Sequence, residues 1–144
     1  MRSFARVRAI PPRQIKKVTL LPMEKPYTIE MEDRDDYLWV LVSGKELTAE
    51  VSVQYWNEIA DQCTSMNCDK VLIEKDFEKS VGPGDMIQMA EHLAKVLPHG
   101  MVAFIDRRHH DAINELGKKL ARNREVMFQV FDHVGDAQKW LLAN

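Results

Sequence analysis

The 144-residue sequence is poor in cysteine and has no long hydrophobic run, and these absences exclude several classes of protein. Its only cysteines, Cys63 and Cys68, are spaced neither as a CxxC redox pair nor as half of a zinc knuckle. The longest apolar run, residues 37–42, is far shorter than the roughly 20 residues of a membrane helix. The first residues include no apolar segment typical of a secretory signal. We therefore expect a cytoplasmic protein without a transmembrane segment.

Charge divides the chain into two parts. Apolar residues at 45% and charged residues at 29% are typical of one ordinary globular domain. Residues 1–23, however, contain six basic residues and no acidic one, so the remainder carries 14 basic and 22 acidic residues. Several prolines interrupt any long helix near the start. We predict a basic N-terminal arm, residues 1–25, that is partly ordered, followed by a single α/β domain, residues 26–144.

The basic arm raises the question of a partner. Nucleic acid or an anionic membrane surface attracts such a segment. The arm nevertheless lacks the interleaved aromatic and basic residues that stack on bases, and we predict no nucleic-acid partner. Its apolar residues Val18, Leu20 and Leu21 predict that the chain from Lys17 onward lies on the sheet or across a homodimer.

Hydrophobic periodicity predicts a sheet that opens with a hairpin. Residues 27–33 and 36–44 alternate or cluster apolar residues around a short acidic turn, which is typical of two antiparallel strands. Thr48 is a suitable N-cap for a helix running to about Ser65. Three buried strands then alternate with helices, and a short helix closes the chain; these elements are expected near residues 70–76, 86–97, 101–106, 113–120, 126–132 and 134–142.

The order of these elements determines the expected fold class. Crossovers of this length between strands imply parallel pairing and right-handed connections. We therefore predict an α/β fold with a mixed sheet, opened by an antiparallel hairpin and continued by parallel βαβ units. In the helix after the first buried strand, residues 70–76, the inward residues are expected to be Met86, Met89, Ala90, Leu93 and Leu97. In the next helix they are expected to be Ile113, Leu116 and Leu120. Trp140 is expected to be buried and to anchor the last helix.

Three stretches resemble the STAS group, and most closely the SpoIIAA-like proteins. They are residues 71–73, residues 102–105 and the tail "NREVMFQVFDHVGDAQKWLL". The resemblance covers roughly residues 27–144 and concerns mostly core positions, so it is specific for the fold and weak for function. It implies a non-catalytic protein, either a phosphorylatable binding switch or a binder of a small molecule or lipid. The expected fold is also similar to that of the CRAL-TRIO lipid-binding domain.

The loop "VGPGD", residues 81–85, precedes a helix and could in principle hold a phosphate. In the anti-anti-sigma branch of the family, the switch serine lies in an Asp-Ser-Ser-Gly stretch, which is absent here. Ser80 is the nearest hydroxyl. Asp85, with Gln88 three residues later, forms a capping-box pattern, and neither a P-loop nor a dinucleotide-binding motif is present. We interpret the loop as a turn.

Aspartates follow the predicted parallel strands where open α/β sheets bind their ligands. Asp76, Asp106 and Asp132 each lie at such a strand end. The same edge is expected to carry Lys75, Arg107, Arg108, His109, His110 and His133. A ligand site and a set of helix caps and turns are both consistent with this pattern; Asp132 in particular fits an N-cap.

No pattern indicates catalysis, a cofactor or a metal site. The adjacent pair His109 and His110 diverges on a helix and cannot share a metal as an i, i+4 pair could. There is no Gly-x-Ser-x-Gly motif. Met86 and Met89 fit either core gap-filling or a methionine-lined apolar pocket.

We therefore predict a non-enzymatic regulatory or binding module of the STAS/SpoIIAA-like type, without a cofactor. Its expected action is protein–protein interaction through a face near residues 76–88. The alternative is a carrier or sensor of a small apolar or lipid-like ligand, held between sheet and helices. The candidate binding residues are Asp76, Ser80, Met86, Met89, Asp106, Arg107, Arg108, His110 and Asp132.

Overall fold

The computed structural model describes residues 25–144, which form a five-stranded mixed sheet with four helices. The strands are β1 (Thr28–Asp33), β2 (Leu38–Glu46), β3 (Lys70–Lys79), β4 (Met101–Asp106) and β5 (Met127–Val130). They lie in the sheet in chain order; β1 pairs antiparallel with β2, and the later neighbours pair in parallel. The predicted fold class is confirmed. The predicted arm, residues 1–25, lies outside the described residues except for Lys25.

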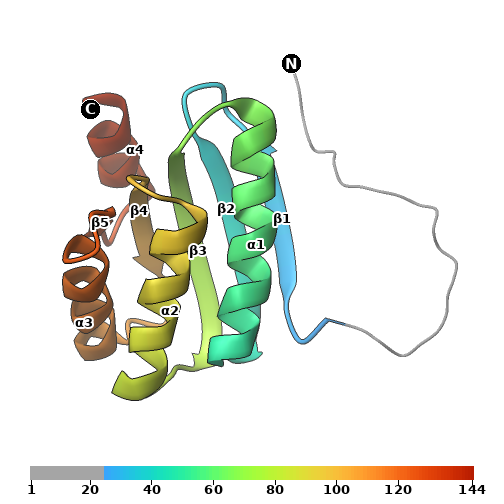
Figure 1. The fold of residues 1–144 in the computed structure, drawn as a ribbon, viewed down its shortest axis with the longest axis vertical. Coiled ribbons are helices and arrows are strands. Elements are labelled where there is room, and N and C mark those ends of the chain that lie inside the picture. Colours follow the sequence, from blue (N-terminus) through green and yellow to red (C-terminus); the bar gives the residue numbers. More distant parts are fainter. Residues whose placement is uncertain (1–24) are drawn as a thin grey trace, which may run out of the picture.

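Three helices cover one face of the sheet and the fourth covers part of the other. The helices are α1 (Ala49–Met66), α2 (Pro83–Val96), α3 (Asp111–Arg122) and α4 (Val134–Leu142). Right-handed crossovers between strands in chain order place α1, α2 and α3 on the same side, and Figure 1 shows them side by side in front of the sheet. Helix α4 packs against β3 and β4.

Alternate residues of the central strands face two separate apolar cores. In β3, Val71 and Ile73 belong to the larger core beneath α1, α2 and α3. Leu72, between them, belongs to a smaller core that also contains Ala137 and Leu141 of α4. A strand that is buried on both faces reads as a nearly continuous apolar run, which explains why the sequence of this strand shows little alternation.

The helix starts agree only partly with the sequence. Thr48 caps α1 as predicted, because its Oγ1 accepts a hydrogen bond of 3.1 Å from the N–H of Val51. The prediction that Asp85 caps α2 is wrong: the N-cap is Gly82, followed by Pro83 in the first turn. Proline fits there because its missing N–H and fixed φ suit the first turn. Asp132 is not a cap either, since α4 begins after His133.

Two expectations about buried side chains need correction. Trp140 is only partly buried, against Phe131, and the fully buried anchors of α4 are Ala137 and Leu141. In α3 the large apolar residues predicted to face inward lie at the margin of the core. The stripe that faces the sheet consists instead of Asn114, Gly117 and Ala121. Small side chains let this helix approach the sheet closely, which a stripe of leucines would prevent.

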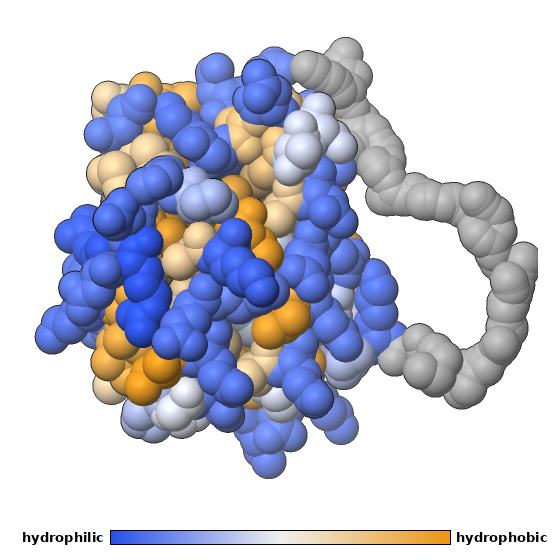
Figure 2. Space-filling model, viewed as in Figure 1, coloured by the Kyte–Doolittle hydropathy of each residue, from blue (hydrophilic) through white to orange (hydrophobic). Residues whose placement is uncertain are grey.

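Within residues 25–144, none of the helices combines the length and the apolar character needed to cross a membrane. In Figure 2, the face formed by the helices is covered mainly by hydrophilic residues, between which smaller apolar areas show.

Candidate functional site

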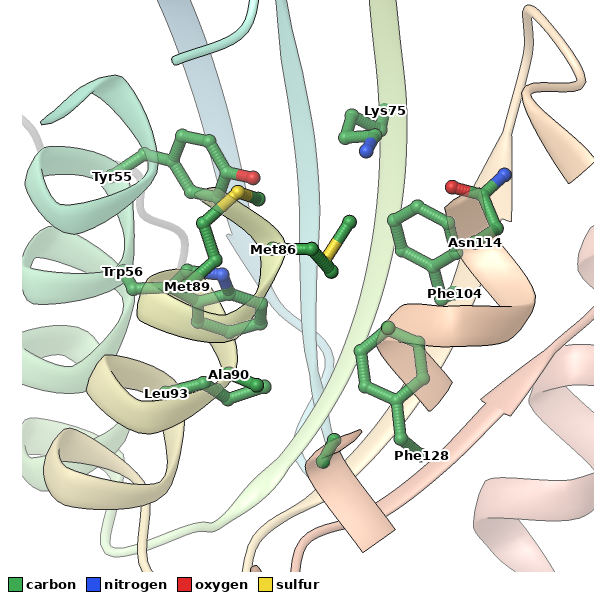
Figure 3. Close-up of a pocket in the computed structure, with 12 residues that line it drawn as sticks. Tyr55, Trp56, Lys75, Met86, Met89, Ala90, Leu93, Phe104, Asn114 and Phe128 are labelled. Atoms are coloured by element: carbon green, nitrogen blue, oxygen red, sulfur yellow. The ribbon is translucent and has the colours of Figure 1, made fainter. Parts of the chain in front are cut away.

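A cavity lies between the sheet and the helices that cover its larger core. Its walls come from α1, α2 and α3 and from β3, β4 and β5. They are mainly apolar and include Tyr55, Trp56, Met86, Met89, Phe104 and Phe128. Figure 3 shows Met86 between the aromatic residues of α1 and those of β4 and β5. The cavity has a volume of about 40 Å³, which is room for about three groups of the size of a water molecule.

One wall of this cavity carries the amine of Lys75. The residue is 2% exposed, and its Nζ lies 4.9 Å from the centre of the Phe104 ring. Burial lowers the pKa of Lys75 to about 8, although the nearby Asp106 carboxylate acts in the opposite direction. None of the hydrogen bonds or ion pairs among residues 25–144 involves this Nζ. A lysine that is buried to this extent is unusual in a protein core, because removing a charged amine from water is costly.

A second polar group of the cavity, the Asn114 amide, is fixed in its orientation by Asp106. Asn114 is buried, and its Nδ2 donates a hydrogen bond of 2.8 Å to Asp106 Oδ2. A carboxylate accepts hydrogen bonds but cannot donate them, so the amide nitrogen must face Asp106. The amide oxygen then points to the Lys75 side of the cavity (Figure 3), and it has no hydrogen-bond partner among the described residues.

Both carboxylate oxygens of Asp106 accept hydrogen bonds. Besides Asn114, the carboxylate accepts the backbone N–H groups of Arg108 and His110, each at 2.9 Å, and it contacts His110 Nδ1 at 3.0 Å. Burial raises the pKa of Asp106, but the hydrogen bonds from Asn114, Arg108 and His110 outweigh it and hold the pKa below the ordinary value. This carboxylate thus stabilises the turn from β4 into α3 and fixes the orientation of the Asn114 amide.

Arg107, Arg108 and Asp76 form two ion pairs on the opposite side of the sheet. Arg107 contacts Glu74 at 2.8 Å, and Glu74 also accepts a 2.8 Å hydrogen bond from Trp39 Nε1. Arg108 contacts Asp76 at 2.7 Å in a more exposed pair. The structure therefore brings Asp76, Arg107 and Arg108 to one edge, but their charges are already matched.

The four remaining candidate binding residues have different environments. The Ser80 hydroxyl is buried and has no hydrogen-bond partner among the described residues. Asp132 is exposed beyond β5 and does not join the cluster around Asp106. Met86 and Met89 are buried in the larger core and also line the cavity.

Sequence reasoning named Lys75 only as a residue of the strand-end edge and did not name Asn114. A signal for Lys75 exists: in a strand of period two it shares a face with Val71, Ile73 and Phe77, all of them apolar. Asn114 lies one helical turn before Gly117, on the stripe of small residues. Neither pattern indicates a cavity, because the space between helix and sheet depends on side chains from several elements.

The polar groups of the cavity include an amine and an amide, and among the described residues its lining contains no carboxylate, thiol or imidazole. No cluster of three or more His, Cys, Asp or Glu side chains within residues 25–144 could hold a metal ion. Burial raises the pKa of Cys63 to about 12, so this thiol is protonated at neutral pH. The cavity instead offers an amine, an amide oxygen and polarizable apolar walls.

The sequence matches no protein-family model and no curated protein. We therefore infer its function from the geometry of the cavity.

Proposed function

We propose that the protein is a binding module for a small molecule with an apolar body and one polar end, held in the cavity between the sheet and α1, α2 and α3. The observation that carries the proposal is a buried amide oxygen without a hydrogen-bond partner among residues 25–144, Asn114 Oδ1, in the same largely apolar cavity as the buried residue Lys75. A ligand would supply the interaction that this oxygen lacks.

The dimensions of the cavity limit the ligand. Without movement of the walls, about three non-hydrogen atoms fit the volume of about 40 Å³. Met86 and Met89 are unbranched and flexible, so a slightly larger molecule can displace them. Long lipid chains exceed this space, and the proposal therefore favours short molecules within the wider class of apolar or lipid-like ligands.

Methyl NMR with propan-1-ol as the probe tests this proposal. In protein labelled at the methionine methyl groups, propan-1-ol is expected to shift the signals of Met86 and Met89 in a saturable way. The signal of Met127, which is 48% exposed on β5, serves as the internal control and should not move. Equal shifts at all methionines, or none at Met86 and Met89, would contradict a specific cavity.

Variants that fill the cavity give a second test. Ala90→Leu adds volume to the cavity wall and should abolish the shifts, whereas Ala112→Leu adds the same volume on the exposed side of α3 and should preserve them. Gly117→Ala offers a milder change, because its Cβ would lie 3.0 Å from Met86 Sδ and push that side chain.

A protein-binding role through residues 76–88 stays a second proposal. It is consistent with the resemblance to SpoIIAA-like proteins, but the buried Ser80 hydroxyl would need local opening before a kinase could reach it. Phosphate analysis of the protein isolated from its source tests this role, and phosphate at Ser80 would favour it.

A further inference from the structure

We propose that Lys75 holds its ligand covalently, as an imine formed between Nζ and a small aldehyde or ketone that enters the cavity. This inference rests on the proposed function, because it names the chemical class of the molecule that the cavity binds. It concerns a covalent binding step and requires no turnover.

The surroundings of Lys75 suit a nucleophile better than half of an ion pair. Its amine faces the ring of Phe104, and the carboxylate at the facing position of β4, Asp106, already accepts hydrogen bonds from its own donors. Tyr55 lines the same cavity, and burial raises the pKa of its phenol, so it carries no charge near neutral pH. The lowered pKa of Lys75, about 8, increases the neutral fraction of the amine. Relative to an exposed lysine, the gain at neutral pH is on the order of a hundredfold.

The proposed step is balanced without an oxidant or reductant. The lone pair of the neutral Lys75 amine attacks the carbonyl carbon and forms a C–N bond, while the carbonyl π electrons move to oxygen. A proton transfers from nitrogen to that oxygen and gives a carbinolamine. The C–O bond then breaks, the oxygen leaves as water with a second proton from nitrogen, and the C=N bond of the imine forms.

The remaining polar group of the cavity favours a neutral carbonyl over a carboxylate. Asn114 Oδ1 can only accept hydrogen bonds, because Asp106 fixes the amide orientation. A carboxylate would bring a negative charge next to this acceptor and toward Asp106. The hydroxyl of a carbinolamine, by contrast, is a donor that can meet an acceptor, and the imine adds no negative charge.

Reductive trapping with propanal tests the inference on the full-length protein. The protein is incubated near neutral pH with dilute propanal and sodium cyanoborohydride, which reduces an imine to a stable propyl amine. Peptide mass spectrometry then gives the rate of modification at each lysine. We expect Lys75 to be propylated at least about tenfold faster than Lys79, which is exposed on the same strand.

The cavity variants connect this reaction to the site. Ala90→Leu should suppress propylation of Lys75 and leave Lys79 unchanged, whereas Ala112→Leu should affect neither. Propylation of Lys75 at or below the rate of Lys79, or an undiminished rate in Ala90→Leu, would overturn the inference. Propan-1-ol has almost the same shape and cannot form an imine. If it shifts the Met86 and Met89 signals while propanal leaves Lys75 unmodified, the covalent step fails and the binding proposal stands; if it shifts neither, the binding proposal itself fails.

Discussion

Lys75 and Asp106 occupy facing positions on the parallel strands β3 and β4, yet they form no ion pair. The carboxylate oxygens of Asp106 accept hydrogen bonds from the backbone of the turn into α3 and from the side chain of Asn114. The amine of Lys75 instead lies over the Phe104 ring, and the residue lines the cavity. A buried charge pair usually compensates part of its desolvation through direct contact. Here direct hydrogen bonds stabilise the carboxylate, whereas the amine has only the more distant charge of Asp106 and the face of the Phe104 ring. This contrast separates the structural role of Asp106 from the binding role that we propose for Lys75.

The cost of burying Lys75 predicts a gain in stability on its removal. Lys75→Met keeps most of the side-chain volume and should raise the free energy of unfolding at neutral pH by about 1–3 kcal/mol. The folded protein releases the Lys75 proton near pH 8, whereas the unfolded chain keeps it up to the ordinary pKa of 10.5. Unfolding between these values takes up a proton, so rising pH favours the folded wild type and the advantage of Lys75→Met shrinks.

Urea unfolding of wild type and Lys75→Met across this pH range measures the difference. Lys79→Met, on the exposed end of the same strand, is the control and should change stability little at any pH. An advantage of Lys75→Met that stays constant up to pH 10.5 would mean that the pKa of Lys75 is not lowered.

Two aspartates at neighbouring strand ends should differ sharply in their contribution to stability. Asp106→Ala removes the acceptor of several buried donors and should cost about 3–5 kcal/mol. Asp76→Ala breaks a largely exposed pair with Arg108 and should cost less than about 1 kcal/mol. Because the folded pKa of Asp106 is lowered, its contribution is present above its ordinary pKa of 3.8 and is lost as the pH falls through the folded value. Denaturant unfolding of both variants is the measurement, and equal costs would refute the central role of Asp106.

Two glycines should respond in opposite ways to alanine. A Cβ at Gly44 would lie 2.9 Å from both a Phe77 ring carbon and the backbone oxygen of Pro26, so Gly44→Ala forces a rearrangement and should destabilise the fold by about 1–3 kcal/mol. A Cβ at Gly135, in the first turn of α4, meets nothing within 4 Å. Gly135→Ala should therefore stabilise the protein by about 0.5–1 kcal/mol through helix propensity. Thermal unfolding compares the two, and a shift of the same sign would contradict the packing around Gly44.

The last helix offers a test of which side chain anchors it. Leu141 is fully buried, and Leu141→Ala should cost about 2–5 kcal/mol. Trp140 is only partly buried, so Trp140→Ala should cost less than the 3–5 kcal/mol typical of a deleted core aromatic. Chemical denaturation ranks the two variants. A larger loss for Trp140→Ala would indicate that Trp140, and not Leu141, holds α4 on the sheet.

The sequence by itself determined the order of the strands and helices of residues 25–144. Apolar stretches such as residues 71–73 and 102–105 report local burial, and their spacing leaves right-handed parallel crossovers as the simplest connection. Thr48 was predictable as a cap because its hydrogen bond to Val51 is local in the chain. Gly82 and Pro83 replaced the predicted Asp85 cap because a turn-forming pair earlier in the loop starts the helix sooner.

Only the tertiary structure decided what the polar residues do. Asp106, Arg107 and Arg108 are consecutive, yet they turn to three different partners: Asn114, Glu74 and Asp76. Lysine is usually exposed, and the pattern around Lys75 alone does not overrule that tendency. Its burial follows from the helices that cover β3, and the cavity beside it follows from the small residues of α3 meeting the flexible side chain of Met86. Such a site depends on side chains that are distant in the chain, and their mutual packing is fixed only when the sheet and the helices come together.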